Sequence, residues 1–164
     1  MTRDSDVLTR SASLIQQHGT GLMTTVDPDG MPCSRYMTAA MLGTNVRQLY
    51  CLTVIHGRKL DHLRHNAAVC WVFADPDREE VVTLYGFARA VDDIINAENL
   101  WDQLIRHVEP YGLSMLGQQA ASEYCFVRTE VDAVEYLDCR ATPIRTRRVQ
   151  IRHDAVAPAW HRPR

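Results

Sequence analysis

Two adjacent cations stand where a short helix is expected to begin. The segment Thr53-Val-Ile-His-Gly-Arg-Lys59 runs from the end of an expected strand, through a loop that contains glycine, to Arg58 and Lys59. The N-terminus of a helix carries unpaired N–H groups and the positive end of the helix dipole, so cations there are unfavourable by themselves. A bound dianion would reverse that sign, and a guanidinium beside an ammonium suits a terminal phosphate. The alternative is an ordinary basic turn in solvent, because short basic motifs often match by chance.

A third cation, Arg35, lies in the segment Arg35-Tyr-Met-Thr-Ala-Ala40, which is expected to be a strand in an otherwise uncharged stretch. Side chains alternate along a strand, so Arg35 and Met37 share one face, and Tyr36 and Thr38 share the other. Taken alone, an arginine on an exposed strand face is the simpler interpretation.

Other residues that could do chemistry form no complete site in the sequence. His62 and His65 are three residues apart on the expected short helix and could begin a metal site, but no third ligand follows nearby, so a solvent-exposed helix surface is favoured. The five cysteines contain no CxxC pair, which argues against a zinc site or a disulfide framework. Cys51 and Cys70 are expected to be small buried apolar residues. No GxSxG motif and no Cys–His pair that would indicate nucleophilic catalysis can be recognised.

The elements that would position these residues are mostly strands. The chain has 164 residues, of which 46% are hydrophobic and 23% charged, and these values are typical of one globular domain. Asp27-Pro-Asp-Gly30 predicts a tight turn, the continuous apolar run over 67–74 predicts a strand buried on both faces, and Gly86 predicts a bulge or a close backbone approach. Hydrophobic periodicity predicts helices over 5–18, 58–65 and 97–108, strands over 21–26, 31–41, 47–54, 67–74 and 81–91, and one or two further strands within 123–140.

This order of elements favours a mainly β (α+β) fold, a six- to seven-stranded antiparallel split β-barrel with flanking helices. A βαβ sheet is less well supported, because only residues 47–74 show a strand–helix–strand order. Residues 1–140 are expected to form the barrel domain, and residues 141–164, rich in Arg and Pro, a C-terminal arm or tail. The arginines between Arg140 and Arg152 could contact a nucleic acid, an acidic partner or a second subunit, but a solvated tail is favoured.

Charge and hydropathy exclude several classes of protein. The formal net charge of −2 argues against a general nucleic-acid or membrane-surface binder. No apolar stretch approaches the length that spans a bilayer, and the polar N-terminus lacks the apolar segment of a signal peptide. A cytoplasmic location without membrane contact is therefore expected.

An ordered set of motifs resembles a known family. The chain is similar to the pyridoxamine 5′-phosphate oxidase-like FMN-binding split barrels, and most similar to their general stress protein branch. The resemblance covers residues 10–92 well and 122–140 weakly, and the ordered set is more specific than any single motif. The motifs are Gly21-Leu-Met-Thr-Thr-Val-Asp-Pro-Asp-Gly-Met-Pro32, Arg35-Tyr-Met37, Leu49-Tyr-Cys-Leu-Thr53, Gly57-Arg-Lys59, Val72-Phe-Ala-Asp75 and Tyr85-Gly-Phe-Ala88.

The resemblance implies FMN bound at a homodimer interface. It implies that the cofactor is contacted by the strand from Arg35 to Ala40 and by the end of the next strand, and that its phosphate is held by three cations. The implied cofactor-binding residues are Arg35, Tyr36, Met37, Thr38, Leu52, Thr53, Arg58 and Lys59, with Arg35, Arg58 and Lys59 at the phosphate.

Three features depart from the family pattern. Glu80 and Val81 occupy the positions of an Arg-Gln pair in true pyridoxamine phosphate oxidases, and the C-terminal Arg/His substrate signature of those enzymes is not recognisable, so oxidation of vitamin B6 is not expected. Leu137 stands where the stress-protein branch often carries a tryptophan.

The favoured function is an FMN-dependent oxidoreductase of unknown small-molecule substrate, with unassigned catalytic residues. A non-catalytic flavin-binding stress protein is one alternative. The same barrel carrying a deazaflavin (F420) or haem is another, and for haem His56 would be a modest candidate for the axial ligand.

Overall fold

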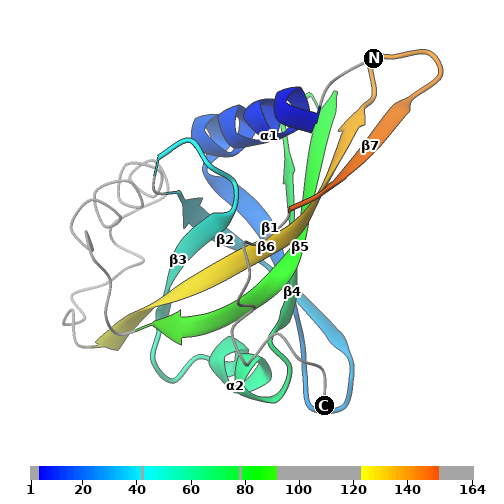
Figure 1. Cartoon of the computed structure of the whole chain (residues 1–164). Coiled ribbons are helices and arrows are strands. Elements are labelled where there is room, and N and C mark those ends of the chain that lie inside the picture. Colours follow the sequence, from blue (N-terminus) through cyan, green and yellow to red (C-terminus); the bar gives the residue numbers. More distant parts are fainter. Residues whose placement is uncertain (1–3, 42, 78, 92–122, 152–164) are drawn as a thin grey trace.

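The computed structural model describes residues 4–41, 43–77, 79–91 and 123–151 (Figure 1). None of the helices among these residues has the length and apolar character needed to cross a membrane. The elements are α1 (Asp4–His18), β1 (Thr20–Val26), β2 (Pro32–Ala40), β3 (Gln48–Val54), α2 (Arg58–His65), β4 (Ala68–Ala74), β5 (Glu80–Val91), β6 (Tyr124–Asp138) and β7 (Arg145–Gln150).

The strands form an antiparallel barrel. They are hydrogen-bonded in the order β3-β2-β1-β4-β5-β6-β7, and an additional pairing of β3 with β6 closes the first six strands. Strand β7 extends the sheet beyond β6, and the helices α1 and α2 lie at opposite ends of the barrel (Figure 1). The predicted mainly β split barrel with flanking helices is therefore confirmed.

Local chemistry explains several boundaries. In the turn between β1 and β2, one carboxylate oxygen of Asp27 accepts the backbone N–H groups of Asp29 and Met31 at 3.0 and 2.8 Å. Gly30 supplies the positive φ of +84° that this turn needs. Helix α2 has the predicted bounds, whereas the segment 123–140 contains one long strand, β6. The helix expected over 97–108 lies outside the described residues.

Gly86 is required where β5 crosses β6. The register between these strands shifts between Tyr85 and Gly86, where β6 carries the extra residue Asp132, so the irregularity lies opposite Gly86 and the predicted close backbone approach is confirmed. A Cβ atom at Gly86 would collide with the backbone carbonyl of Glu130 on β6. The backbones approach closely enough that no other residue fits without displacement of a strand.

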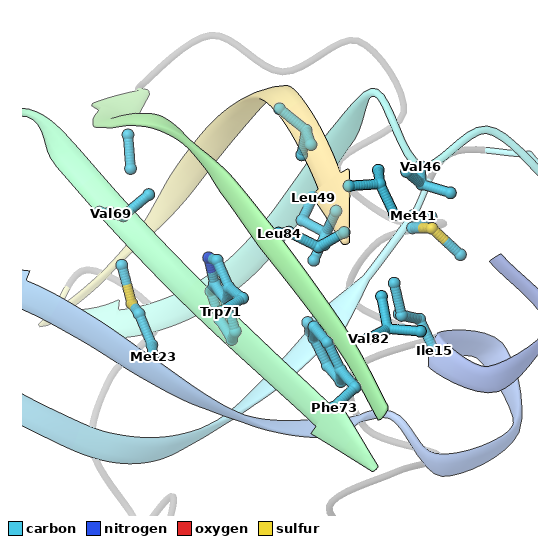
Figure 2. Packing of buried hydrophobic residues seen from close by; sticks show 14 of the residues in the cluster. Ile15, Met23, Met41, Val46, Leu49, Val69, Trp71, Phe73, Val82 and Leu84 are labelled. Carbon is cyan, nitrogen blue, oxygen red and sulfur yellow. The ribbon is translucent and has the colours of Figure 1, made fainter. Parts of the chain in front are cut away.

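The barrel interior holds one continuous apolar core (Figure 2). Trp71 and Phe73 of β4 are buried and stack with ring centroids 5.7 Å apart and planes 7° apart, and the indole N–H of Trp71 donates to Thr129 Oγ1 at 3.2 Å. The expectation that β4 is buried on both faces is wrong, because its side chains alternate between buried and half-buried. A barrel wall has only one interior face, so Cys70 is half-buried whereas Cys51 is buried.

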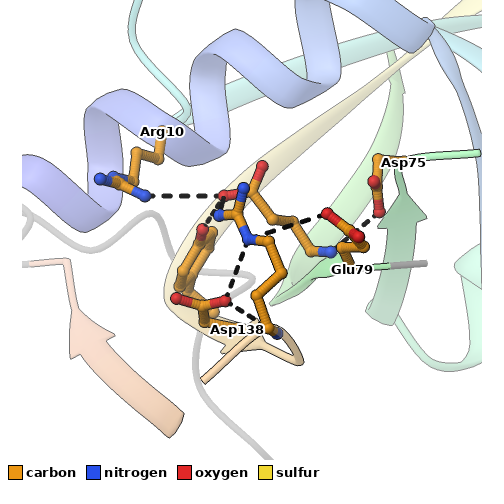
Figure 3. A network of polar contacts seen from close by, with 7 residues as sticks. Arg10, Asp75, Glu79 and Asp138 are labelled. Carbon is orange, nitrogen blue, oxygen red and sulfur yellow. Dashed lines mark hydrogen bonds and ion pairs between the residues drawn. The ribbon is translucent and has the colours of Figure 1, made fainter. Parts of the chain in front are cut away.

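A polar network joins α1 to the adjoining ends of β5 and β6 (Figure 3). The carboxylate of Glu80 accepts hydrogen bonds from Arg140 Nη2, at 2.6 Å, and from the Tyr136 hydroxyl, and it lies 3.6 Å from Arg10 Nη1. Arg140 also pairs with Asp138 at 3.3 Å. The pair of Arg10 with Glu80 is the contact of this network to α1, and the buried side chains of Val7, Leu14 and Ile15 pack the helix onto the core.

Part of the predicted C-terminal arm is a strand. Arg145–Gln150 forms β7, which pairs with residues 133–138 of β6. Arg147 Nη2 binds Asp4 Oδ1 at 2.7 Å, and the guanidinium of Arg148 lies 4.8 Å from the centroid of the Tyr85 ring. The domain boundary at residue 140 stays a prediction, and residues 152–164 lie outside the described part of the chain.

Candidate anion-binding site at the α2 end of the barrel

A tight turn connects β3 to α2 and brings the paired cations to the end of the barrel. The backbone N–H of Gly57 donates to the carbonyl of Val54 at 3.0 Å. A Cβ atom at Gly57 would lie 3.1 Å from this carbonyl and 3.4 Å from Thr53 Oγ1, so a larger residue would press on the turn. No side chain caps the start of α2, where the backbone N–H of Leu60 donates to the carbonyl of Gly57 at 2.9 Å.

Lys59 points back toward the end of the barrel. Its ammonium donates to the hydroxyl of Thr53 at 2.6 Å, and Thr53 is 4% exposed on the interior face of β3. Lys59 is itself half-buried. Burial lowers the pKa of Lys59, and the positive charge of Arg35 lowers it further. The side chain is therefore held in one orientation, with its charge poorly solvated.

Arg35 reaches the same end of the barrel from β2. Its Nη1 donates to Thr25 Oγ1 at 2.7 Å, and the carbonyl oxygen of Met23 lies 3.4 Å away. Burial lowers the pKa of Arg35, and the positive charge of Arg58 adds to this effect. Arg35, Arg58 and Lys59 thus form a group of three cations close enough to repel one another. We call them the cation cluster.

The cation cluster has no acidic counterpart in the described part of the chain. Within residues 4–41, 43–77, 79–91 and 123–151, no carboxylate forms an ion pair with any of its three members. Asp61, the acidic residue in the first turn of α2, pairs with Arg64 instead. Like charges held together in a partly desolvated place destabilise the protein, and an anion of two negative charges would relieve that cost.

The other predicted cofactor residues divide between the two faces of the barrel wall. Met37 shares the inner face with Arg35 and packs against the core. Tyr36 is 77% exposed on the outer face, which it shares with Thr38. Leu52 also faces outward, where it packs with Phe126 against a small second apolar cluster. The structure therefore brings Arg35, Thr53, Arg58 and Lys59 to one place and puts Tyr36, Thr38 and Leu52 on the other side of the wall.

His62 belongs to the surroundings of the cation cluster, and the expectation that it faces solvent is wrong. It is 8% exposed, and its Nδ1 lies 3.0 Å from Thr25 Oγ1, the atom that accepts from Arg35. The expectation holds for His65, which is exposed and lies with its Nδ1 2.8 Å from the carbonyl of Asp61. Across the described ranges, no three side chains are grouped as metal ligands would be. His56 is exposed in the turn before α2.

Glu80, one of the residues that departs from the family pattern, lies in the α1 network and not beside the cation cluster. Its carboxylate is engaged by Arg10, Tyr136 and Arg140. The neighbouring Val81 pairs in register with Leu137 of β6. Glu80 and Val81, which stand at the positions expected for the Arg-Gln pair of a true oxidase, therefore make structural contacts in this chain.

Comparison with solved structures shows the same fold at low sequence identity. A protein related to general stress protein 26 from Clostridium acetobutylicum matches with a TM-score of 0.69 and 19% identity, over 91% of this chain and 97% of that one. A heme binding protein from Mycobacterium smegmatis matches with a TM-score of 0.69 and 14% identity, over 92% of this chain and 60% of that one. An FMN binding protein from Nostoc punctiforme, related to pyridoxamine 5′-phosphate oxidase, matches with a TM-score of 0.56 and 15% identity, over 91% and 95%.

Sequence comparison assigns the family. No curated protein sequence matches the chain significantly. The model of the family described as pyridoxamine 5′-phosphate oxidase matches residues 9–138, which include the whole barrel from β1 to β6 and the three members of the cation cluster. With this match and the barrel topology, the chain belongs to the pyridoxamine 5′-phosphate oxidase family.

Proposed function

We propose that this chain is an FMN-binding flavoprotein whose cation cluster holds the phosphate of FMN, and that it acts as an FMN-dependent oxidoreductase on a small molecule. The observation that carries the proposal is the group of three cations, two of them half-buried, with no carboxylate paired to them among the described residues. The FMN binding protein from Nostoc punctiforme, which has the same fold, supports the choice of ligand.

The residues around the cation cluster fit a phosphate monoester. Arg35 offers a planar set of N–H donors and Lys59 a compact charge, and both are already oriented by threonine hydroxyls at 2.7 and 2.6 Å. Little side-chain freedom would be lost on binding, which favours affinity. The first turn of α2 adds N–H groups and the positive end of its dipole.

In such a protein, the bound flavin supplies the exchange of two electrons with a substrate. The chain's own residues bind and orient the cofactor and exclude water, so no side-chain nucleophile is required. This agrees with a sequence in which no nucleophile–base pair is recognisable.

The first expected result is a yellow protein that carries FMN when purified. Denaturation should release one flavin whose mass and absorption spectrum identify it as FMN. Release of a deazaflavin or of haem would contradict the choice of cofactor, and for haem His56 would be the candidate axial ligand.

Under anaerobic conditions, the reduced flavin of an enzyme should be reoxidised when its substrate is added, whereas a non-catalytic flavin-binding protein should show no substrate-dependent reoxidation.

We also propose that the chain works as a homodimer with the cofactor between subunits. The outer face of the wall presents the exposed side chains of Tyr36, at 77%, and Val54, at 38%, and Ile55 in the turn after β3 is 36% exposed. A second copy of the chain would cover these side chains. The outer face of that second copy would then lie beside a ligand held at the cation cluster of the first. Twofold association is the commonest form of small soluble oligomers.

Charge at Tyr36 should weaken this dimer. Tyr36→Arg places a cation on the proposed interface and should raise the dimer dissociation constant about tenfold or more, measured by sedimentation velocity. Met31→Arg is the matched control, because Met31 is 62% exposed, directly after the tip of the β1–β2 turn. If the dimer is weakened in both variants, or in neither, the interface does not lie at Tyr36.

A further inference from the structure

The buried pair Thr25 and His62 connects the two halves of the cation cluster. Arg35 comes from β2, whereas Arg58 and Lys59 come from α2, so their separation depends on how α2 sits against the sheet. Thr25, on β1, is fully buried and contacts both sides: its Oγ1 lies 2.7 Å from Arg35 Nη1 and 3.0 Å from His62 Nδ1.

Chemistry fixes the direction of the first of these two hydrogen bonds, and the tautomer of His62 decides the second. A guanidinium can only donate, so Thr25 Oγ1 accepts from Arg35. The single hydroxyl hydrogen of Thr25 can then point at His62 Nδ1 as its acceptor; in the opposite tautomer, the second lone pair of Oγ1 would accept from Nδ1–H instead. The first direction, in which Thr25 both accepts and donates, is the one that we infer, and it requires the ring proton of His62 to be on Nε2.

Helix geometry makes this hydrogen bond relevant to the other two cations. His62 follows Lys59 by three residues and Arg58 by four, and residues with these spacings share one side of a helix. The apolar residues Leu60 and Leu63 also hold α2 against the barrel, but apolar contacts have no preferred direction, whereas a hydrogen bond fixes both distance and angle.

We propose that Thr25 and His62 are positioning residues for the anion site: the hydrogen bond between them sets the orientation of Arg35 and its separation from Arg58 and Lys59. This inference rests on the proposed function, since the phosphate of FMN is the group that the three cations would hold. The loss of either partner leaves the cations present but misplaced.

The test compares Thr25→Val, which removes the hydroxyl and keeps the shape, with Thr25→Ser, which keeps the hydroxyl. Each variant is titrated with FMN and with riboflavin, which has the same ring and no phosphate. Thr25→Val should weaken FMN binding about tenfold and riboflavin binding by less than about twofold, whereas Thr25→Ser should bind FMN within about threefold of the wild type. Equal losses for the two flavins, or no loss of FMN affinity, would overturn the proposal.

A measurement without cofactor separates this proposal from the function it rests on. In ¹⁵N NMR spectra of the free wild-type protein, taken where His62 is neutral, the ring proton should be found on Nε2 and Nδ1 should show the shift of a hydrogen-bond acceptor. A proton on Nδ1 would overturn the inferred direction of the hydrogen bond between Thr25 and His62. If the wild type binds no FMN, the proposed function fails, and the tautomer of His62 still decides the hydrogen-bond order.

Discussion

Replacement of both Arg58 and Lys59 by alanine is expected to weaken FMN binding by about 10²- to 10⁴-fold. Each cation would donate a charge-assisted hydrogen bond to the phosphate, and such bonds contribute roughly 1.5–3 kcal/mol apiece. Two of them amount to about 3–6 kcal/mol, at about 1.4 kcal/mol for each tenfold change in affinity. Isothermal titration of the apoprotein with FMN would measure the loss.

Arg64→Ala is the matched control for this double variant. Arg64 is an exposed cation of the same helix, but its partner is Asp61 and it lies outside the cation cluster. Its removal should change FMN affinity by less than about twofold. A folded double variant that still binds FMN as tightly as the wild type would show that the phosphate is held somewhere else.

The second large effect is expected in the core. Trp71→Ala removes a fully buried indole that stacks on Phe73 and donates to Thr129. Substitutions of this type cost about 3–5 kcal/mol, because apolar burial is lost and a cavity is left. Loss of the indole N–H also leaves the Thr129 hydroxyl without this donor. That is a large part of the roughly 5–15 kcal/mol by which a domain is stable.

Urea denaturation would measure this effect, and it should be done without FMN, because a bound ligand adds stability of its own. Trp71→Phe keeps an aromatic ring beside Phe73 and should cost less, about 1–2 kcal/mol, since a smaller volume and one hydrogen bond are lost. If Trp71→Ala unfolds at the same urea concentration as the wild type, the packing shown in Figure 2 does not carry the stability of the barrel.

The local parts of the fold could be predicted from the sequence because their causes are local. The turn at Asp27 depends on residues within four positions of one another, and α2 begins directly after Gly57. The close approach at Gly86 was also predictable, because a glycine in the middle of a long strand pattern typically marks a bulge or a close approach of two backbones.

What could not be predicted depends on contacts between distant segments. His62 resembles any polar residue of a short surface helix until Thr25, 37 residues earlier, is placed against it. Strand β7 contains three arginines and only one buried residue, Val149, so its composition resembles a solvated tail. It is a strand because β6 is long enough to offer hydrogen bonds beyond the barrel.

Strand β7 also bears on the behaviour of the protein at high concentration. Within the described residues, β7 ends the sheet, and no strand pairs with its side away from β6. An unpaired strand side is a template on which other chains can aggregate. Arg145 and Arg148 place positive charge on this short strand, whereas Arg147 is paired with Asp4, and two copies brought together there would repel each other. We therefore expect the charge on β7 to oppose edge-to-edge association of the protein at high concentration.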